Sequence, residues 1–259
     1  MAVDTTKLAS AWRSSRLIYR AVEDNEEDRS FLSQHLDNDP SSVPMTQMRA
    51  CAPAPRTAQD RYYQGLGPAC LLRVFICLPP SSDRQEVINR MAAGDPELEG
   101  LNENEAYEFE QGQINHAYLH SERPISAKQK SKLTPIGTIT LFQKGGEIAA
   151  HHRCAFLGVT VIWDYRGAGY GREAIDWALD WGFLRGGLHR IELEAASYNE
   201  TALKLYRKLG FVEEGRAREA IRFERKWYDL VSMGILEQEW EALREEAREK
   251  EEREMEESG

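Results

Sequence analysis

A glycine-rich stretch between a predicted strand and a predicted helix constrains the fold of this 259-residue chain more than any other feature. It runs from Arg166 to Arg172 (RGAGYGR) and follows the β-branched segment 156–163 (FLGVTVIW). Residues 169–184 then place apolar side chains at the spacing of one buried helical face, and 189–197 alternate like a half-buried strand. The run predicts a strand–helix–strand unit with its glycines at the start of the helix.

Weaker patterns extend this unit in both directions. An acidic first turn before Phe31 predicts an early helix, and Gly210 is placed as the C-cap of a later one. Residues 38–68 are rich in Pro, Ser and Ala, which predicts loops or short helices. The remaining predicted elements are strands at 17–22, 70–78, 135–143, 211–214 and 227–236 and a helix at 200–209.

Composition excludes several classes of protein. Hydrophobic residues make up 41% of the chain, which is typical of a globular domain, and no apolar run approaches the length of a membrane span. A net charge of −10 argues against nucleic acid or membrane partners. The start of the chain lacks the apolar stretch of a secretory signal, and the four cysteines have no paired spacing. We therefore expect a cytoplasmic protein, with a nuclear location left open.

The domain prediction is one domain over 1–236, with a polar insert at 81–134 between two strands and an acidic helical tail at 237–259. Residues 237–257 contain eleven glutamates and four basic residues, so the tail should be a solvated helix and the rest of the chain is close to neutral. The overall charge thus says nothing about the substrate. The basic residues between 216 and 226 are predicted to form a solvated hairpin loop.

The glycine stretch predicts an anion site. Glycines let the backbone approach a ligand, the first helical turn has unpaired N–H groups, and Arg166 and Arg172 add charge, so a phosphate or pyrophosphate is the expected guest. A dinucleotide fingerprint would need a third glycine where Arg172 stands, and no P-loop pattern occurs. Neither His116 with His120 nor His151–His152 with Cys154 has a third metal ligand at a recognised spacing, so no metal site is predicted.

Two motifs resemble the GCN5-related N-acetyltransferase (GNAT) superfamily, particularly its ribosomal-protein and small-molecule branch. The first is the segment from Val161 to Gly171 (VIWDYRGAGYG). The second has the form Asn-x-x-Ala-x-x-Leu-Tyr-x-x-Leu-Gly-Phe and is made by Asn199, Ala202, Leu205, Tyr206, Leu209, Gly210 and Phe211. The resemblance implies an α/β (α+β) fold with a central mixed, mostly antiparallel twisted sheet of six or seven strands flanked by helices, here followed by the charged C-terminal helix.

The resemblance also implies acetyl-CoA as co-substrate and assigns roles to particular residues. Val159 and Val161 would bond the pantetheine amides through their backbones, and Asn199 would orient the pantetheine arm. Tyr206 would protonate the departing thiolate. The pyrophosphate would be held by the glycine turn, made of Arg166, Gly167, Ala168, Gly169, Tyr170, Gly171 and Arg172.

The general base is less defined than the acid. Glu194 is the preferred candidate and Glu192 its rival, and both lie on one face of a predicted strand; a base elsewhere or a chain of waters is also open. Ser197 with Glu200 has the pattern of a capping box, which we favour over a catalytic role for Ser197.

The predicted function is transfer of an acetyl group from acetyl-CoA to an amine by direct attack in a ternary complex. The cysteines lie outside both motifs, so an acyl-enzyme has no support. The acceptor is an amine on a small molecule or a protein: a polyamine or another small amine, a protein N-terminus or a lysine. A homodimer is an expected assembly. The alternative is a non-catalytic acyl-CoA-binding or scaffold protein with the same fold.

Overall fold

The computed structural model describes residues 11–46, 53–55, 70–81, 84–119, 132–143 and 146–258. The chain divides into two compact units, one made of Met1–Ala21 with Phe75–Ile136 and the other of Val22–Val74 with Gly137–Gly259. The division passes through two strands, β2 (Cys70–Leu78) and β3 (Thr134–Phe142), which both occur where the sequence predicts them.

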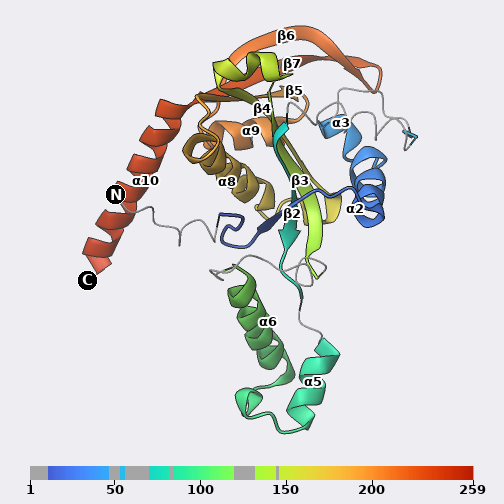
Figure 1. Cartoon of the computed structure of the whole chain (residues 1–259), viewed down its shortest axis with the longest axis vertical. Helices are drawn as coiled ribbons and strands as arrows, with labels where there is room; N and C mark the ends of the chain where they lie inside the picture. The colour runs from blue at the N-terminus through green and yellow to red at the C-terminus, as the bar shows by residue number, and fades with distance from the viewer. Residues whose placement is uncertain are drawn as a thin grey trace. The chain divides into compact units, whose positions relative to one another are not determined.

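Seven strands form one mixed, mostly antiparallel sheet in the order β1-β2-β3-β4-β5-β7-β6, which confirms the predicted fold class (Figure 1). Only β4 and β5 are shown to pair in parallel, as expected for two strands joined through a helix. The bounds of the strands not yet given are β1 (Ile18–Ala21), β4 (Cys154–Val161), β5 (Arg190–Ala196), β6 (Val212–Phe223) and β7 (Lys226–Leu236).

The parallel strands β4 and β5 separate after a short pairing. Their register extends only from Cys154 opposite Arg190 to Phe156 opposite Glu192. Beyond that point β4 stays paired with β3 as far as Val161, and β5 stays paired with β7 as far as Ala196. Each strand therefore follows its outer neighbour, and a gap opens between the second halves of β4 and β5.

Helix α8 (Tyr170–Leu184) joins these two strands and packs on the sheet through the predicted face. Ile175, Ala178, Leu179 and Phe183 are all buried. Gly182 sets how closely the helix approaches β5, because a Cβ at this position would lie 2.7 Å from the Cδ1 atom of Ile191. The helix begins at the glycine turn, and the first residues of the helix line the same cavity as the end of β4.

Helix α9 (Glu200–Lys208) follows β5 and begins with a cap that differs from the prediction. The side chain of Asn199, not Ser197, accepts the hydrogen bond from the N–H of Ala202, so the predicted Ser197–Glu200 capping box is wrong. Ser197 Oγ instead accepts from the N–H of Asp229 on β7. The helix ends as predicted at Gly210, which has the left-handed φ of 93° that glycine adopts without strain.

The early part of the larger unit is helical. The helix predicted before Phe31 is present as α2 (Glu26–Phe31), continued by the π-helical η1 (Leu32–Asp37), and Asn25 caps it by accepting from the N–H of Asp28. The single-turn α3 (Val43–Thr46) lies in the Pro- and Ser-rich segment, as predicted. Two short helical turns, η4 (Gly146–His152) and η5 (Trp163–Tyr165), flank β4.

The predicted insert forms helices in the smaller unit. Helix α5 (Arg84–Ala92), the short η3 (Pro96–Leu98) and α6 (Glu103–Leu119) are packed around Val87, Leu98 and Ala106 (Figure 1). Arg90 joins the elements by pairing with Asp95 and Glu110. The insert thus has a small core of its own despite its polar composition.

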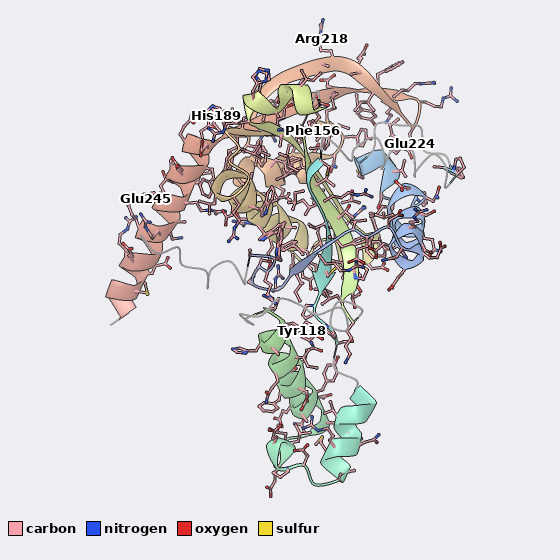
Figure 2. The ribbon with its side chains drawn as sticks, viewed as in Figure 1. Tyr118, Phe156, His189, Arg218, Glu224 and Glu245 are labelled. Atoms are coloured by element: carbon pink, nitrogen blue, oxygen red, sulfur yellow. The ribbon has the colours of Figure 1, made fainter. Side chains whose placement is uncertain are left out.

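The closing hairpin corrects the sequence prediction. Strand β6 extends to Phe223 rather than ending at 214, so Arg216, Arg218 and Arg222 lie on a strand and not in a loop. The pattern concealed this because β6 is the edge strand and is exposed along nearly its whole length, so it needs no hydrophobic alternation. Figure 2 shows Arg218 pointing away from the sheet and Glu224 at the turn.

The C-terminal helix α10 (Glu237–Ser258) is present, but it is not solvated along its whole length as predicted. Trp240 is buried, packs against Phe183 of α8 with ring centroids 5.3 Å apart, and donates from Nε1 to Asp180 at 3.1 Å. Arg244 pairs with Asp180 at 2.6 Å and with Asp176 at 2.8 Å. The first turns of α10 are therefore part of the larger unit, and Glu245 lies beyond the contact with Trp240 (Figure 2).

We expect Trp240→Ala to lower the free energy of unfolding by about 3 kcal/mol, because it removes a buried aromatic side chain and leaves a cavity against Phe183. Glu249→Ala, farther along the same helix at an exposed position, should change it by less than about 0.5 kcal/mol. Denaturant unfolding followed by circular dichroism measures both. Equal stability of the two variants would show that α10 does not anchor to α8.

Candidate active site

A cavity of about 610 Å³ opens where β4 and β5 separate. Its walls come from the end of β4, the glycine turn, the first turns of α8 and α9, and Met45 of α3. Nine residues singled out from the sequence line it: Val159, Val161, Arg166, Gly167, Gly169, Gly171, Arg172, Asn199 and Tyr206. The structure therefore brings together residues from both sequence motifs.

The glycine turn has the geometry of an anion site. Gly167 and Gly169 have φ angles of 81° and 86°, a region that other residues adopt only with strain. No side chain caps the N-terminus of α8, and the N–H groups of a first helical turn have no acceptor within the helix. The exposed Arg172 lies in this first turn and lines the cavity. These features fit the pyrophosphate of a CoA thioester.

Arg166 lines the cavity, but its guanidinium is bound within the protein. Nε donates to the carbonyl of Val161 at 2.7 Å, and the two terminal nitrogens donate to Ser42 Oγ at 2.6 Å and to the carbonyl of Ser41 at 3.3 Å. Burial lowers the pKa of Arg166, an effect that the nearby charge of Asp39 partly opposes. The structure thus directs this arginine toward α3, which the sequence motif did not indicate.

Tyr206 is buried in α9 with its ring edge-on to Phe211, 5.9 Å between centroids. Burial raises the pKa of its hydroxyl to about 12. No hydrogen-bond partner of this hydroxyl is found among the residues described, and the side chain lines the cavity. Tyr206 therefore keeps its proton throughout the neutral pH range and can donate it to a ligand.

The adjacent residues Tyr198 and Asn199, which precede α9, connect the cavity to the segment around α3. The hydroxyl of Tyr198 donates to the carbonyl of Pro44, and Asn199 Nδ2 donates to the carbonyl of Met45 at 3.4 Å. The ring of Tyr198 stacks on Phe223 and meets Tyr228 edge-on. Burial, and to a smaller extent Tyr228, raises the pKa of Tyr198.

Some predicted residues are absent from the cavity wall. Ala168 and Tyr170 belong to the glycine turn and to the start of α8, but neither lines the cavity. Glu194 lies on β5 opposite Ser232 of β7 and is half-buried outside it. Its rival Glu192 is paired with Arg190 at 3.2 Å. This pairing holds Glu192 in a charge network away from the cavity.

Several lining residues were missed by the sequence reasoning. Trp163 and Tyr165 immediately precede the glycine turn, and Trp163 remains 66% exposed, which is unusual for a tryptophan. Their place inside the motif from Val161 to Gly171 could have identified them. Met45 carried no such signal, because it is distant in sequence and lies in a segment without a periodic pattern.

The structure describes all but one of the histidine and cysteine candidates for a metal site. Within the part of the chain that the structure describes, no group of three or more His, Cys, Asp or Glu side chains is placed to hold an ion. The rings of His151 and His152 lie 3.9 Å apart on an exposed turn, His116 is exposed on α6, and His120 lies outside the described residues.

Comparison with known proteins explains this combination of motifs. The model of the acetyltransferase (GNAT) family matches residues 91–211. Spermidine N(1)-acetyltransferase of Vibrio cholerae is 33% identical over 129 residues, which is 50% of this chain and 72% of that protein. The chain belongs to the GNAT acetyltransferase family. It is accordingly an N-acetyltransferase that uses acetyl-CoA as co-substrate.

Two further relatives agree with this assignment. Spermidine N(1)-acetyltransferase of Escherichia coli K12 is 30% identical over 94 residues, covering 36% of this acetyltransferase and 50% of the relative. The crystal structure of spermidine N-acetyltransferase from Vibrio cholerae in complex with CoA and spermine superposes with a TM-score of 0.56. It is 21% identical and covers 88% of this chain and 99% of that one, a likeness that supports the fold.

No helix within the described ranges is both long enough and apolar enough to cross a membrane.

We expect Tyr206→Phe to lower kcat by about 10²-fold without abolishing turnover, because it removes one proton donor and leaves the binding of both substrates intact. Since the pKa of Tyr206 is raised to about 12, the neutral phenol persists up to about pH 10, and its ionisation should not reduce the unaltered enzyme's kcat between pH 7 and 10. Steady-state rates across this pH range test both points. An unchanged rate at saturating substrates would remove Tyr206 from the role of acid.

Proposed function

We propose that this acetyltransferase acetylates a small cationic amine of the polyamine type. The observation that carries the proposal is the 33% identity over 72% of a spermidine N(1)-acetyltransferase. Glu200, at the start of α9, lines the cavity, and its carboxylate, which pairs with Lys204 at 3.4 Å, would bind an ammonium group of the acceptor in place of that lysine. An acceptor on a protein remains the alternative, with the N-terminus and lysine as its two forms.

In the proposed reaction both substrates meet in the cavity. The backbone groups of Val159 and Val161 lie along the edge of β4 that β5 leaves, where the amides of a pantetheine arm could pair as an added strand does. The glycine turn and Arg172 would hold the pyrophosphate. Acetyl-CoA supplies the activated acyl group, and the chain's contribution is mainly to hold the thioester carbonyl beside the amine.

The proton balance assigns a role to Tyr206. The amine nitrogen must be deprotonated to form a bond to the thioester carbonyl, and the carbon–sulfur bond breaks as the sulfur leaves with its electron pair. Tyr206 would donate its proton to that sulfur. A thiol has an ordinary pKa near 8.5, well below the pKa of Tyr206, so this proton transfer is unfavourable by itself and has to be coupled to cleavage of the carbon–sulfur bond. The tyrosinate then regains a proton from solvent, which has received the proton lost by the amine nitrogen.

Glu194 is retained as the proposed base, acting through water because it does not line the cavity. Replacing it by glutamine should lower kcat at pH 7 by about tenfold or more, since no carboxylate then removes the proton of the ammonium. The loss should diminish toward pH 10, where more of the amine is already deprotonated. Measurement of kcat against pH decides this, and a profile identical to that of the unaltered enzyme would exclude Glu194.

Acceptor choice can be tested by following thiol release from acetyl-CoA. Spermidine and spermine are compared with a peptide bearing a free N-terminus and a peptide bearing one lysine. We expect kcat/KM for the polyamines to exceed that for either peptide by about 10²-fold. A site that binds two or more ammonium groups would have groups left without a partner when the acceptor carries only one amine. Reactions without enzyme serve as the control for non-enzymatic transfer. Preference for a peptide would favour the protein-acceptor alternative.

The remaining predictions accompany this proposal. One domain over 1–236 with an acidic tail, a cytoplasmic location and a homodimer are each expected for an enzyme of this kind and stay predictions.

A further inference from the structure

Residues 39–45, called the strap here, cross the end of the cavity. They include the start of α3 and contact elements on both sides of the gap between β4 and β5. One end is bound by Arg166, which follows β4, and the other by Tyr198 and Asn199, which follow β5. Met45 lines the cavity from within the strap. The strap therefore joins two strands that have separated from each other.

The first end of the strap is held by two consecutive hydrogen bonds that link Arg166 to Asp39. Arg166 donates to Ser42 Oγ at 2.6 Å, and Ser42 Oγ donates to Asp39 at 2.6 Å. Ser42 is fully buried, so its hydroxyl contacts only protein groups. Burial raises the pKa of Asp39, but the hydrogen bonds from Ser42 and Ser41 and the charge of Arg166 outweigh this and lower it. Arg166 and Asp39 thus form an ion pair mediated by a serine.

The guanidinium of Arg166 is oriented by hydrogen bonds from all three of its nitrogens. Each of its three nitrogens has a protein acceptor: Val161 on β4 for Nε, and Ser41 and Ser42 on the strap for the two terminal nitrogens. These bonds use three of the five N–H donors of the guanidinium, and because its fork is rigid the group cannot turn toward a phosphate without breaking them. For Arg172, which is exposed in the first turn of α8, no such hydrogen bonds are found among the described residues.

We propose that Arg166 is a positioning residue that locks the strap over the pantetheine end of the cavity, rather than a ligand of the pyrophosphate. The inference rests on the proposed use of this cavity for CoA. It predicts that the effects of replacing Arg166 and Ser42 are not additive and that either replacement weakens binding of the pantetheine arm. The phosphates would be held by the glycine turn and Arg172 without help from Arg166.

Two ligands separate the two roles in calorimetric titrations of the full chain. CoA contains the pantetheine arm, whereas adenosine 3′-phosphate 5′-diphosphate contains the pyrophosphate without it. We expect Arg166→Met to raise the Kd for CoA about tenfold, the size typical of losing charge-assisted hydrogen bonds, and to leave the Kd for the phosphate fragment within about threefold. Arg172→Ala should raise both Kd values.

Matched variants test the coupling. Ser42 does not line the cavity, yet Ser42→Ala should raise the Kd for CoA several-fold. The Kd of the double variant should be no higher than that of Arg166→Met alone. Arg166→Lys keeps the charge but lacks the fork, so it should not restore binding. Arg222→Met, at an exposed position on β6, controls for loss of one positive charge. If Arg166→Met does not fold, Ser42→Ala with the two ligands decides the question alone.

Three results would overturn the proposal: equal weakening of CoA and of the phosphate fragment by Arg166→Met, full rescue by Arg166→Lys, or additive effects of the Arg166 and Ser42 variants. Failure of the proposed use of the cavity for CoA is distinguishable, because the unaltered chain would then bind neither CoA nor the fragment, whereas a wrong acceptor would leave both Kd values unchanged.

Discussion

The separation of β4 from β5 is the constraint on which the rest of this structure depends. Each strand is held by an antiparallel neighbour on its outer side, so the two cannot close on each other. The gap leaves one edge of β4 without a strand partner while the neighbouring elements stay ordered. Because α8 and α9 both begin at this end of the sheet, the gap collects a helix N-terminus, a glycine turn and a buried tyrosine in one cavity.

Neutral groups supply much of the positive potential and the proton donor in the cavity. Backbone N–H groups and the dipole of α8 supply positive potential at the glycine turn, and Tyr206 is kept protonated by burial. Among the charged side chains that the sequence reasoning considered, Glu192 pairs with Arg190 and Arg166 donates to Ser42 of the strap.

Local patterns predicted the parts of the fold in which sequence neighbours determine the structure. The glycine turn, the apolar face of α8 and the end of α9 at Gly210 all depend on residues within a few positions of one another. Strand β6 was underestimated because an edge strand with both faces exposed has no hydrophobic period. The docking of α10 depends on Trp240 and Arg244 meeting α8, a contact that a count of glutamates conceals.

The candidate site divides in the same way. The motif residues of the glycine turn and Tyr206 could be located from spacing, whereas Met45 and the strap could not, because their partners are remote in sequence. The partners of the Arg166 side chain could not be predicted for the same reason. A motif specifies which residue occurs beside the turn, but only the tertiary structure shows that its side chain points to Ser42.

The strap also has a consequence for how the enzyme acquires its active form. Its bonds to Arg166 and Tyr198 link residues 124 and 154 positions apart, so closing them requires much of the chain to be present and ordered. Contacts of this separation form late, because the entropy of closing a long loop must be met before they contribute. The strap is synthesised well before these partners, because it precedes them in the chain, and would be among the last segments to reach its native place, so binding competence should mature after the sheet itself has folded.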